Sequence, residues 1–238
     1  MAETTNKVAL ITGANKGIGL EIARQLGKQN IVVVIGSRDT ARGQQAAETL
    51  KAEGIDAHTV KLEVTNEADI DALPAYFERN FGRLDILVNN AGVISEAQGI
   101  TPQTFRDGYE SNVIAPYFIT QALLPLLQAS PAGRIVNHSS ILGSITVNGS
   151  GDLPDTWLLP IYNSSKAALN LLTAQQAAKA KGTDLKVNAA HPGSVKTDMN
   201  PGGDLTVEQG AKTAVRLATL PEDGPTGGFF HFNDTLAW

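Results

Sequence analysis

Short runs of aliphatic and β-branched residues alternate with longer amphipathic stretches from residue 8 to about residue 187. This alternation is typical of βαβ units, in which helices cover both faces of a parallel sheet. Strands buried in this way are apolar over most of their length rather than at every second position. Segments of that kind predict strands at 8–12, 31–36, 57–62, 84–89, 134–138 and 185–190.

The stretches between these strands have the spacing of amphipathic helices. They predict helices at 18–28, 40–52, 67–80, 102–128 and 161–181, the fourth bent near Pro116 and Pro125. After Pro192 the periodicity loosens, and a helix at 206–220 and an apolar run near Phe229 close the chain. Two segments rich in Gly, Pro, Asn and Asp, 144–160 and 194–205, are predicted to be loops of a size that is often functional.

The composition fits one large domain over residues 1–238, with 42% hydrophobic and 18% charged residues. The net charge of −5 gives no reason to expect nucleic acid or an anionic membrane as a partner, so small polar or neutral molecules are the expected substrates. The absence of cysteine excludes disulfides, thiol catalysis and thiolate metal sites. No apolar run has the length of a signal peptide core or a membrane span, so we expect a cytoplasmic protein.

A glycine-rich segment, TGANKGIG at 12–19, joins the first predicted strand to the first predicted helix. Gly13, Gly17 and Gly19 would let the backbone turn tightly and approach a pyrophosphate, whose charge meets the positive end of the helix. The spacing is Gly-x-x-x-Gly-x-Gly rather than the usual Gly-x-Gly-x-x-Gly, so the glycines alone fit an ordinary turn equally well. Their place at the first βα junction favours a dinucleotide. Together these features predict an α/β fold: a single-domain, Rossmann-type, doubly wound parallel sheet with helices on both faces.

The end of the second predicted strand indicates which dinucleotide would bind. NAD binders place an acid there to hold the ribose 2′-hydroxyl, whereas this chain reads Gly36, Ser37, Arg38, with Asp39 one position further on. Arg38 and Lys16 offer two cations for a 2′-phosphate. The sequence therefore favours NADP over NAD; the alternative is that both cations are solvated surface charges.

Tyr162 and Lys166 lie four residues apart in the segment YNSSK, within a predicted helix. This spacing puts a phenol and an ammonium on one helix face. An unperturbed Tyr has a pKa of about 10, and a fixed cation nearby favours the phenolate. The pair can therefore act as an acid–base catalyst, although the same spacing occurs by chance in many helices.

Four motifs follow one another over nearly the whole chain: the glycine turn, NNAG at 89–92, Ser140 and YNSSK. With them the chain resembles the classical short-chain dehydrogenase/reductase family, and within it the carbonyl reductases that use NADPH. The resemblance implies that Tyr162 donates a proton in reduction and accepts one in oxidation, while Lys166 lowers its pKa and holds the nicotinamide ribose. It implies that Ser140 hydrogen-bonds the substrate carbonyl. Asn112 matches a fourth catalytic residue, which holds a water chain to Lys166.

Ser139 competes with Ser140 for this role, and only one of two successive strand residues can face the site. The family places its serine three residues before a glycine, which fits Ser140 and Gly143.

The resemblance also implies a set of cofactor contacts along the chain. The adenine contact would fall to Glu63, where the family usually has an Asp, or to the backbone of Val64. The implied cofactor-binding residues are Gly13, Asn15, Lys16, Gly17, Ile18, Gly19, Arg38, Glu63, Val64, Asn90, Ala91, Gly92, Tyr162, Lys166, Pro192, Gly193, Val195 and Thr197.

The segment between Ser140 and Tyr162 is longer than in most members of that family, and the extra residues form an insertion at about 144–160. We expect this insertion to rim an apolar substrate pocket for a neutral ketone, aldehyde or quinone. Trp157 would line the pocket or would only anchor the insertion to the core. The predicted pocket residues are Ile141, Leu142, Trp157 and Met199. Monomeric carbonyl reductases carry a longer insertion that covers the helix face used by others for assembly, so monomer and homo-oligomer stay open.

Two alternatives to a carbonyl reductase are an alcohol or steroid dehydrogenase that works oxidatively with NAD or NADP, and a non-catalytic dinucleotide-binding regulator. The second is disfavoured because a sensor has no need to retain Ser140, Tyr162 and Lys166 together. The four His show no ligand spacing, and the sequence predicts no metal site.

Overall fold

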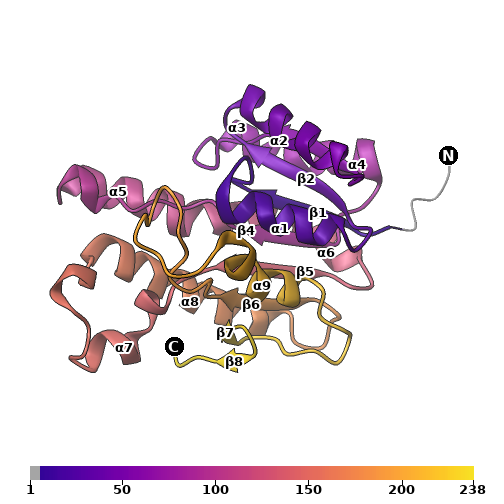
Figure 1. Ribbon diagram of the computed structural model, residues 1–238. Coiled ribbons are helices and arrows are strands. Elements are labelled where there is room, and N and C mark those ends of the chain that lie inside the picture. Colours follow the sequence, from indigo (N-terminus) through magenta and orange to yellow (C-terminus); the bar gives the residue numbers. More distant parts are fainter. Residues whose placement is uncertain (1–5) are drawn as a thin grey trace.

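A computed structural model describes residues 6–238 and contains one eight-stranded sheet in the order β3-β2-β1-β4-β5-β6-β7-β8 (Figure 1). Strands β1 to β7 pair in parallel, and the short β8 is antiparallel to β7. The α/β, Rossmann-type prediction is therefore confirmed. The strands are β1 (Val8–Thr12), β2 (Val32–Ser37), β3 (Ala57–Lys61), β4 (Ile86–Asn89), β5 (Arg134–His138), β6 (Lys186–Ala190), β7 (Phe229–His231) and β8 (Asp234–Thr235).

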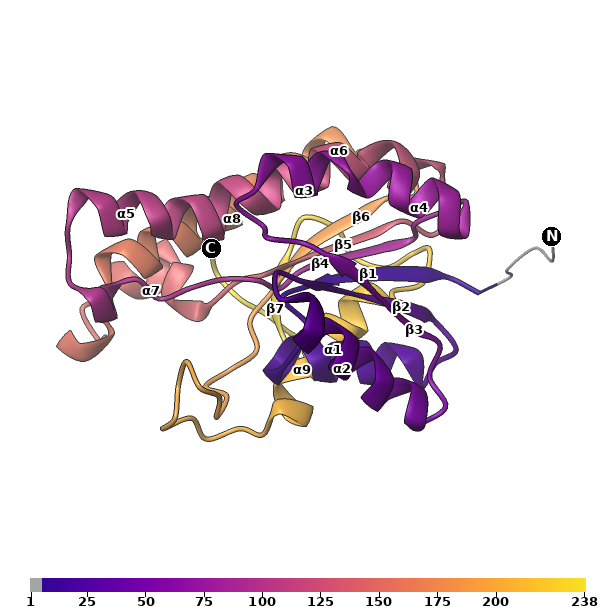
Figure 2. The ribbon, with the colours of Figure 1, turned by 90° about the horizontal axis from the view of Figure 1, so that it is seen from above.

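Helices form a layer on each face of this sheet (Figure 2). One layer holds α1 (Gly17–Gly27), α2 (Thr40–Ala52) and α9 (Val207–Ala218); the other holds α3 (Glu67–Asp71), α4 (Leu73–Phe81), α5 (Pro102–Tyr109), α6 (Ala115–Ala129) and α8 (Pro160–Lys179). In β1, Ala9 and Ile11 pack into the first layer while Val8 and Leu10 pack into the second. Both faces are buried, which explains the unbroken apolar runs of the central strands.

Two predicted helices are interrupted, in each case next to a proline. The predicted helix 67–80 is divided into α3 and α4 because Pro74 lacks a backbone N–H and its ring would clash with the carbonyl of residue 70. The predicted helix 102–128 contains a π-helical turn, η2 (Glu110–Ile114), immediately before Pro116, whereas Pro125 is accommodated within α6. Such wider turns are often found at functional sites, and η2 carries Asn112.

The insertion at 144–160 is more ordered than a loop. It contains the short helix α7 (Ile145–Gly149) and a 3₁₀ turn, η4 (Asp155–Trp157). The Ser144 side chain begins α7 by accepting a hydrogen bond from the Val147 N–H at 3.2 Å. The segment 194–205 is mostly irregular, as predicted, with one isolated bridge between Val195 and Leu205. Within residues 6–238, no helix has the length and hydropathy that crossing a membrane requires.

Asp85, just before β4, hydrogen-bonds to the first residue of β1 and to residues outside the sheet, and this supports a prediction on stability. Its fully buried carboxylate accepts hydrogen bonds from the Val8 N–H at 2.8 Å, the Ser130 hydroxyl at 2.5 Å and the Arg83 guanidinium at 2.6 and 2.9 Å. Asp85→Ala should lower the free energy of unfolding by about 3 kcal/mol, because several buried donors and a cation lose their partner. Denaturant unfolding measures this. Asp56→Ala, which removes a solvent-exposed side-chain contact with His58, is the matched control and should stay within about 0.5 kcal/mol of wild type.

Candidate active site

The site lies where the carboxyl ends of β1, β4, β5 and β6 meet, the edge at which open α/β sheets bind ligands. In both ribbon views α5, α7 and the loop after β6 extend past this edge of the sheet (Figures 1 and 2). The Thr12 hydroxyl at the end of β1 accepts hydrogen bonds from the N–H groups of Asn90 at 3.0 Å and Ala91 at 2.9 Å. The glycine turn and the NNAG segment are thus fixed to each other.

The glycines of the turn permit this close packing. Gly13 has a φ of 63°, and a Cβ there would lie 3.1 Å from the Cα of Ala91. A Cβ on Gly19 would lie 2.5 Å from the side-chain nitrogen of Asn90. The N-cap of α1, Lys16, makes no side-chain capping hydrogen bond. The positive end of α1 is therefore available to an anion, as the sequence predicts.

The cations predicted to select NADP have different surroundings. Arg38 is exposed after β2, and its side chain makes no ion pair or hydrogen bond within the described residues 6–238. Asp39 is turned away into α2, where its carboxylate caps the helix by accepting from the Arg42 N–H at 3.0 Å. Lys16 pairs with Asp198 of the loop after β6 at 2.5 Å, and both side chains are largely exposed. Arg38 is thus the freer of the two cations.

Glu63 and Val64 follow β3, and both are partly exposed. The Glu63 N–H donates to the Asp69 carboxylate at 2.9 Å, which fixes the backbone at the strand's end. Their contact with adenine stays a prediction.

Lys166 is buried in α8, with its side chain pointing to the end of β5. Its ammonium donates a hydrogen bond to the His138 carbonyl at 2.8 Å and lies 5.6 Å from the centre of the Tyr162 ring. Burial lowers the pKa of Lys166 to about 8. Burial also lowers the pKa of His138 to about 3, with smaller effects of Lys166 and His191, so His138 is neutral beside the ammonium.

Tyr162 and Ser140 face each other across the site. Burial raises the pKa of Tyr162 to about 12; a hydrogen bond with the Ser140 hydroxyl acts in the opposite direction, and the charge of Glu96 raises it further. The sequence-based expectation is that Lys166 lowers this pKa, but in the protein alone burial outweighs any such effect. The phenol of Tyr162 is consequently protonated at neutral pH.

The two candidate serines have separate surroundings. The Ser139 hydroxyl donates to the Asn170 side-chain oxygen at 2.6 Å, in a fully buried contact between β5 and α8. The Ser140 hydroxyl accepts from the Leu142 N–H at 3.2 Å and meets Tyr162. The structure thus brings Ser140, Tyr162 and Lys166 together and leaves Ser139 in the interior.

Asn112 holds the segment that follows β4. Its amide accepts from the Val93 N–H and donates to the Val93 carbonyl, both at 2.9 Å, and also donates to the Ser165 hydroxyl at 3.0 Å. A Cβ on Gly92 would lie 3.0 Å from the Asn112 oxygen and 3.5 Å from the Lys166 nitrogen. Asn112 and Lys166 therefore both approach Gly92, and the role of Asn112 in holding a water chain to Lys166 stays a prediction. Asn89 braces the sheet through the Asn137 side chain at 2.8 Å.

The loop after β6 contains the predicted nicotinamide contacts Pro192, Gly193, Val195 and Thr197. Gly193 has a φ of 87° and lies beside His231 and Leu205. Val195 as a whole is 3% exposed, so its side chain is buried and its predicted cofactor contact stays a prediction. Thr197 is partly exposed, and its N–H donates to the Asn200 carbonyl at 3.1 Å.

The predicted substrate pocket is partly formed by exposed apolar side chains. Ile141 and Leu142 are half-buried next to Ser140, whereas Trp157 and Met199 are 47% and 49% exposed. The insertion is anchored by backbone and amide groups: the Trp157 carbonyl accepts from the Asn163 amide at 2.9 Å. The exposed Trp157 indole is therefore not the anchor. Within residues 6–238 no group of three or more metal-ligating side chains gathers.

Comparison with known proteins agrees with this geometry. The sequence model of the short chain dehydrogenase family matches residues 7–205. The chain belongs to this family. A (+)-neomenthol dehydrogenase from Arabidopsis thaliana is 37% identical, over 97% of this chain and 97% of its own.

Two solved structures have the same fold over nearly their whole length. The structure of salutaridine reductase from Papaver somniferum gives a TM-score of 0.84 at 31% identity, covering 96% of this chain and 100% of that one. An NADPH-bound carbonyl reductase from chicken fatty liver gives 0.84 at 30% identity, covering 98% and 99%. The predicted family membership is confirmed.

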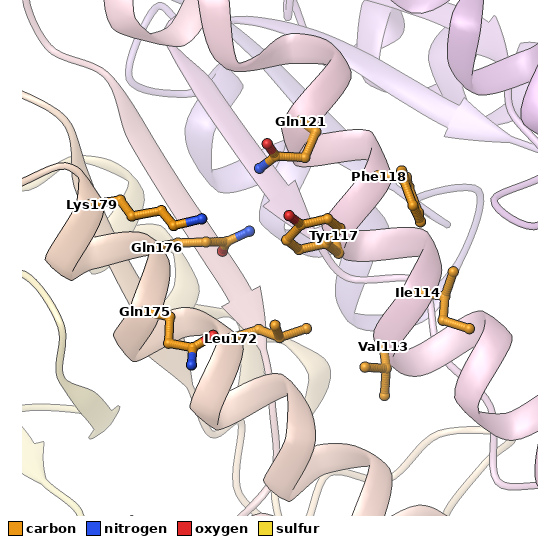
Figure 3. Close-up of a pocket in the computed structure, with 9 residues that line it drawn as sticks. All are labelled: Val113, Ile114, Tyr117, Phe118, Gln121, Leu172, Gln175, Gln176 and Lys179. Carbon is orange, nitrogen blue, oxygen red and sulfur yellow. The ribbon is translucent and has the colours of Figure 1, made fainter.

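A groove of about 350 Å³ lies outside the candidate site of this short chain dehydrogenase, between α6 and α8 (Figure 3). All of its lining residues come from η2, α6 and α8, and none from the insertion at 144–160. Phe118 on this side of α6 is 54% exposed. The insertion therefore leaves this helix face open.

Two residues that lie near the site are not among the site residues predicted from the sequence. Glu96, in the 3₁₀ turn η1 (Glu96–Gln98), accepts a hydrogen bond from the Tyr162 N–H at 2.7 Å. His138 is predicted only as a strand residue, although its carbonyl binds Lys166 and its Nδ1 is buried without a partner among the described residues. His138 could have been singled out in the sequence because it is a polar residue within an otherwise apolar strand. Nothing in the sequence around Glu96 indicates its contact with Tyr162, which is 66 residues away.

Proposed function

We propose that this short chain dehydrogenase reduces a neutral ketone, aldehyde or quinone with NADPH, with Tyr162 as the proton donor. The observation that carries the proposal is the grouping of the Tyr162 phenol with the Ser140 hydroxyl and, one helical turn away, the buried ammonium of Lys166. A protonated phenol can supply the proton in reduction, and the salutaridine reductase and carbonyl reductase structures that this chain resembles support reduction over an oxidative dehydrogenase. Small carbonyl compounds suit the half-exposed apolar residues around the site.

The residues present fit NADPH. The uncapped N-terminus of α1, with Gly13 and Gly19 packed against 90–91, would hold the pyrophosphate, and Arg38 would pair with the 2′-phosphate. Lys166, Gly92 and the loop at 192–197 would bind the nicotinamide end. The bound NADPH of the carbonyl reductase from chicken fatty liver supports this choice of cofactor. When bound, NADPH supplies the hydride.

Residues of this chain would stabilise the negative charge that develops on the substrate oxygen. Ser140 donates a hydrogen bond to that oxygen, and Tyr162 transfers its proton to it as the carbonyl carbon is reduced. The phenolate left behind is stabilised by the Lys166 ammonium 5.6 Å from the ring centre. Asn112 keeps Val93 and the end of NNAG in place beside Lys166.

A screen for NADPH oxidation across ketones, aldehydes and quinones tests the proposal, with Tyr162→Phe as the blank. We expect turnover of at least one neutral carbonyl by wild type and none above background by the variant. The same screen with alcohols and NAD or NADP covers the oxidative alternative. Activity with alcohols alone, or with no compound, would refute the proposal.

Arg38 provides a prediction on cofactor choice. Arg38→Asp should shift the ratio of kcat/KM with NADPH to that with NADH by about 100-fold towards NADH, because a charge-assisted contact with phosphate is replaced by repulsion. Steady-state kinetics with both cofactors measure this ratio. Arg42→Asp, a charge reversal at an exposed residue four positions on, is the control. A wild type that prefers NADH would contradict the assignment.

A further inference from the structure

The catalytic helix α8 begins without a side-chain cap of its own. Its N-cap is Leu159, which cannot accept a hydrogen bond through its side chain, and Pro160 occupies the first helical position. The first N–H groups of a helix have no partner inside the helix, so they need one from elsewhere. Tyr162 is the third residue of α8, and its N–H is one of these groups.

Glu96 supplies the missing acceptor from a distant part of the chain. Its Oε1 accepts a hydrogen bond from the Tyr162 N–H at 2.7 Å, although the residues are 66 positions apart. Glu96 opens η1, shortly after the NNAG segment. A negative charge at a helix N-terminus is stabilising, so this contact joins the segment after β4 to the first turn of α8.

A cap alone would not require a carboxylate at this position. The second oxygen of Glu96, Oε2, is buried and has no hydrogen-bond partner within residues 6–238. Leaving a buried acceptor unpaired costs free energy, and a hydroxyl side chain would cap the helix without that cost. The feature that the carboxylate adds is its charge, which lies 2.7 Å from the backbone nitrogen of the residue that carries the phenol.

We propose that Glu96 is a positioning residue for Tyr162: from the turn after β4, its carboxylate fixes the first turn of α8 and places a negative charge at the backbone of the residue that carries the phenol. This inference rests on the proposed role of Tyr162 as proton donor. The negative charge opposes the phenolate and therefore opposes Lys166, which favours it. His138, the other titratable group beside Lys166, is neutral. Glu96 and Lys166 are then opposite charges on the two sides of Tyr162, in addition to the effects of burial and of Ser140 on its proton affinity.

Two substitutions separate the hydrogen bond from the charge. Glu96→Gln keeps an oxygen that can accept from the Tyr162 N–H and removes the charge. We expect kcat within about threefold of wild type, and the midpoint of the pH profile that reports Tyr162 ionisation to fall by about one unit. Glu96→Ala removes both and should also lower kcat about tenfold with little change in the KM for NADPH, because the phenol loses its fixed position.

The measurement is the pH dependence of kcat/KM for carbonyl reduction and for oxidation of the corresponding alcohol, in wild type and the two variants. Glu67→Gln, which removes an exposed acid from the first turn of α3, is the matched control and should leave the midpoint unchanged. An active wild type with the same midpoint in Glu96→Gln would overturn the inference alone. A wild type without activity on any carbonyl would overturn the proposed function and this inference with it.

Discussion

Tyr162→Phe should lower kcat for carbonyl reduction at least about 100-fold, because it removes only the hydroxyl that carries the transferred proton. The phenyl ring keeps its place in α8, so the dissociation constant of NADPH, measured by fluorescence, should change less than about threefold. Tyr117→Phe removes a hydroxyl from the α6–α8 groove, away from the site, and is the matched control. It should retain full activity. A Tyr162→Phe variant as active as wild type would exclude Tyr162 as the donor.

Ser140→Ala should lower kcat about 100- to 1,000-fold, because the substrate oxygen loses a hydrogen bond that strengthens as charge develops on it. Ser139→Ala provides an internal comparison at the next position. It breaks the buried contact with Asn170 and should reduce the thermal stability while kcat stays within about threefold of wild type. Kinetics and thermal unfolding of both variants measure the two effects. The reverse pattern would assign the substrate contact to Ser139.

Much of the fold could be predicted because the central strands are buried on both faces. The strand predicted at 134–138 has the same bounds as the observed β5, Arg134–His138. The helix α2 begins at Thr40, as predicted, because the Asp39 side chain caps it. The candidate catalytic residues could be located because their motifs are local: Tyr162 and Lys166 share α8, and Ser140 lies two residues after the end of β5. These contacts depend on short-range spacing and on the meeting of strand ends at one edge.

The remainder depends on contacts between distant residues. The π turn at Asn112 arises where α5 meets α6 before Pro116, and neither periodicity nor composition marks it. The sequence predicts a bend near Pro116 but not the wider π-helical turn that precedes it. The Glu96 contact could only have been suspected from the missing cap at Leu159 and Pro160, and its partner lies in another part of the chain.

The insertion illustrates the same limit. Its Gly, Pro, Asn and Asp content predicts a loop, but Ser144 caps the short helix α7 and Thr146 hydrogen-bonds to the Trp238 carbonyl at 3.0 Å. Local propensity could have suggested the cap, whereas the contact with residue 238 is set by tertiary packing. The α6–α8 face left open beside it keeps both a monomer and a homo-oligomer consistent with the chain.

Transfer of deuterium to a carbonyl substrate from NADPH that carries deuterium at both hydrogens of the nicotinamide C4 tests the central claim most directly. With an active ketone or aldehyde from the screen, wild type should yield an alcohol that carries one deuterium on the former carbonyl carbon. Tyr162→Phe should bind the labelled cofactor equally well and form at least about 100-fold less labelled alcohol per unit time. An unlabelled alcohol, or equal rates of labelling by the two proteins, would contradict hydride transfer with Tyr162 as the proton donor.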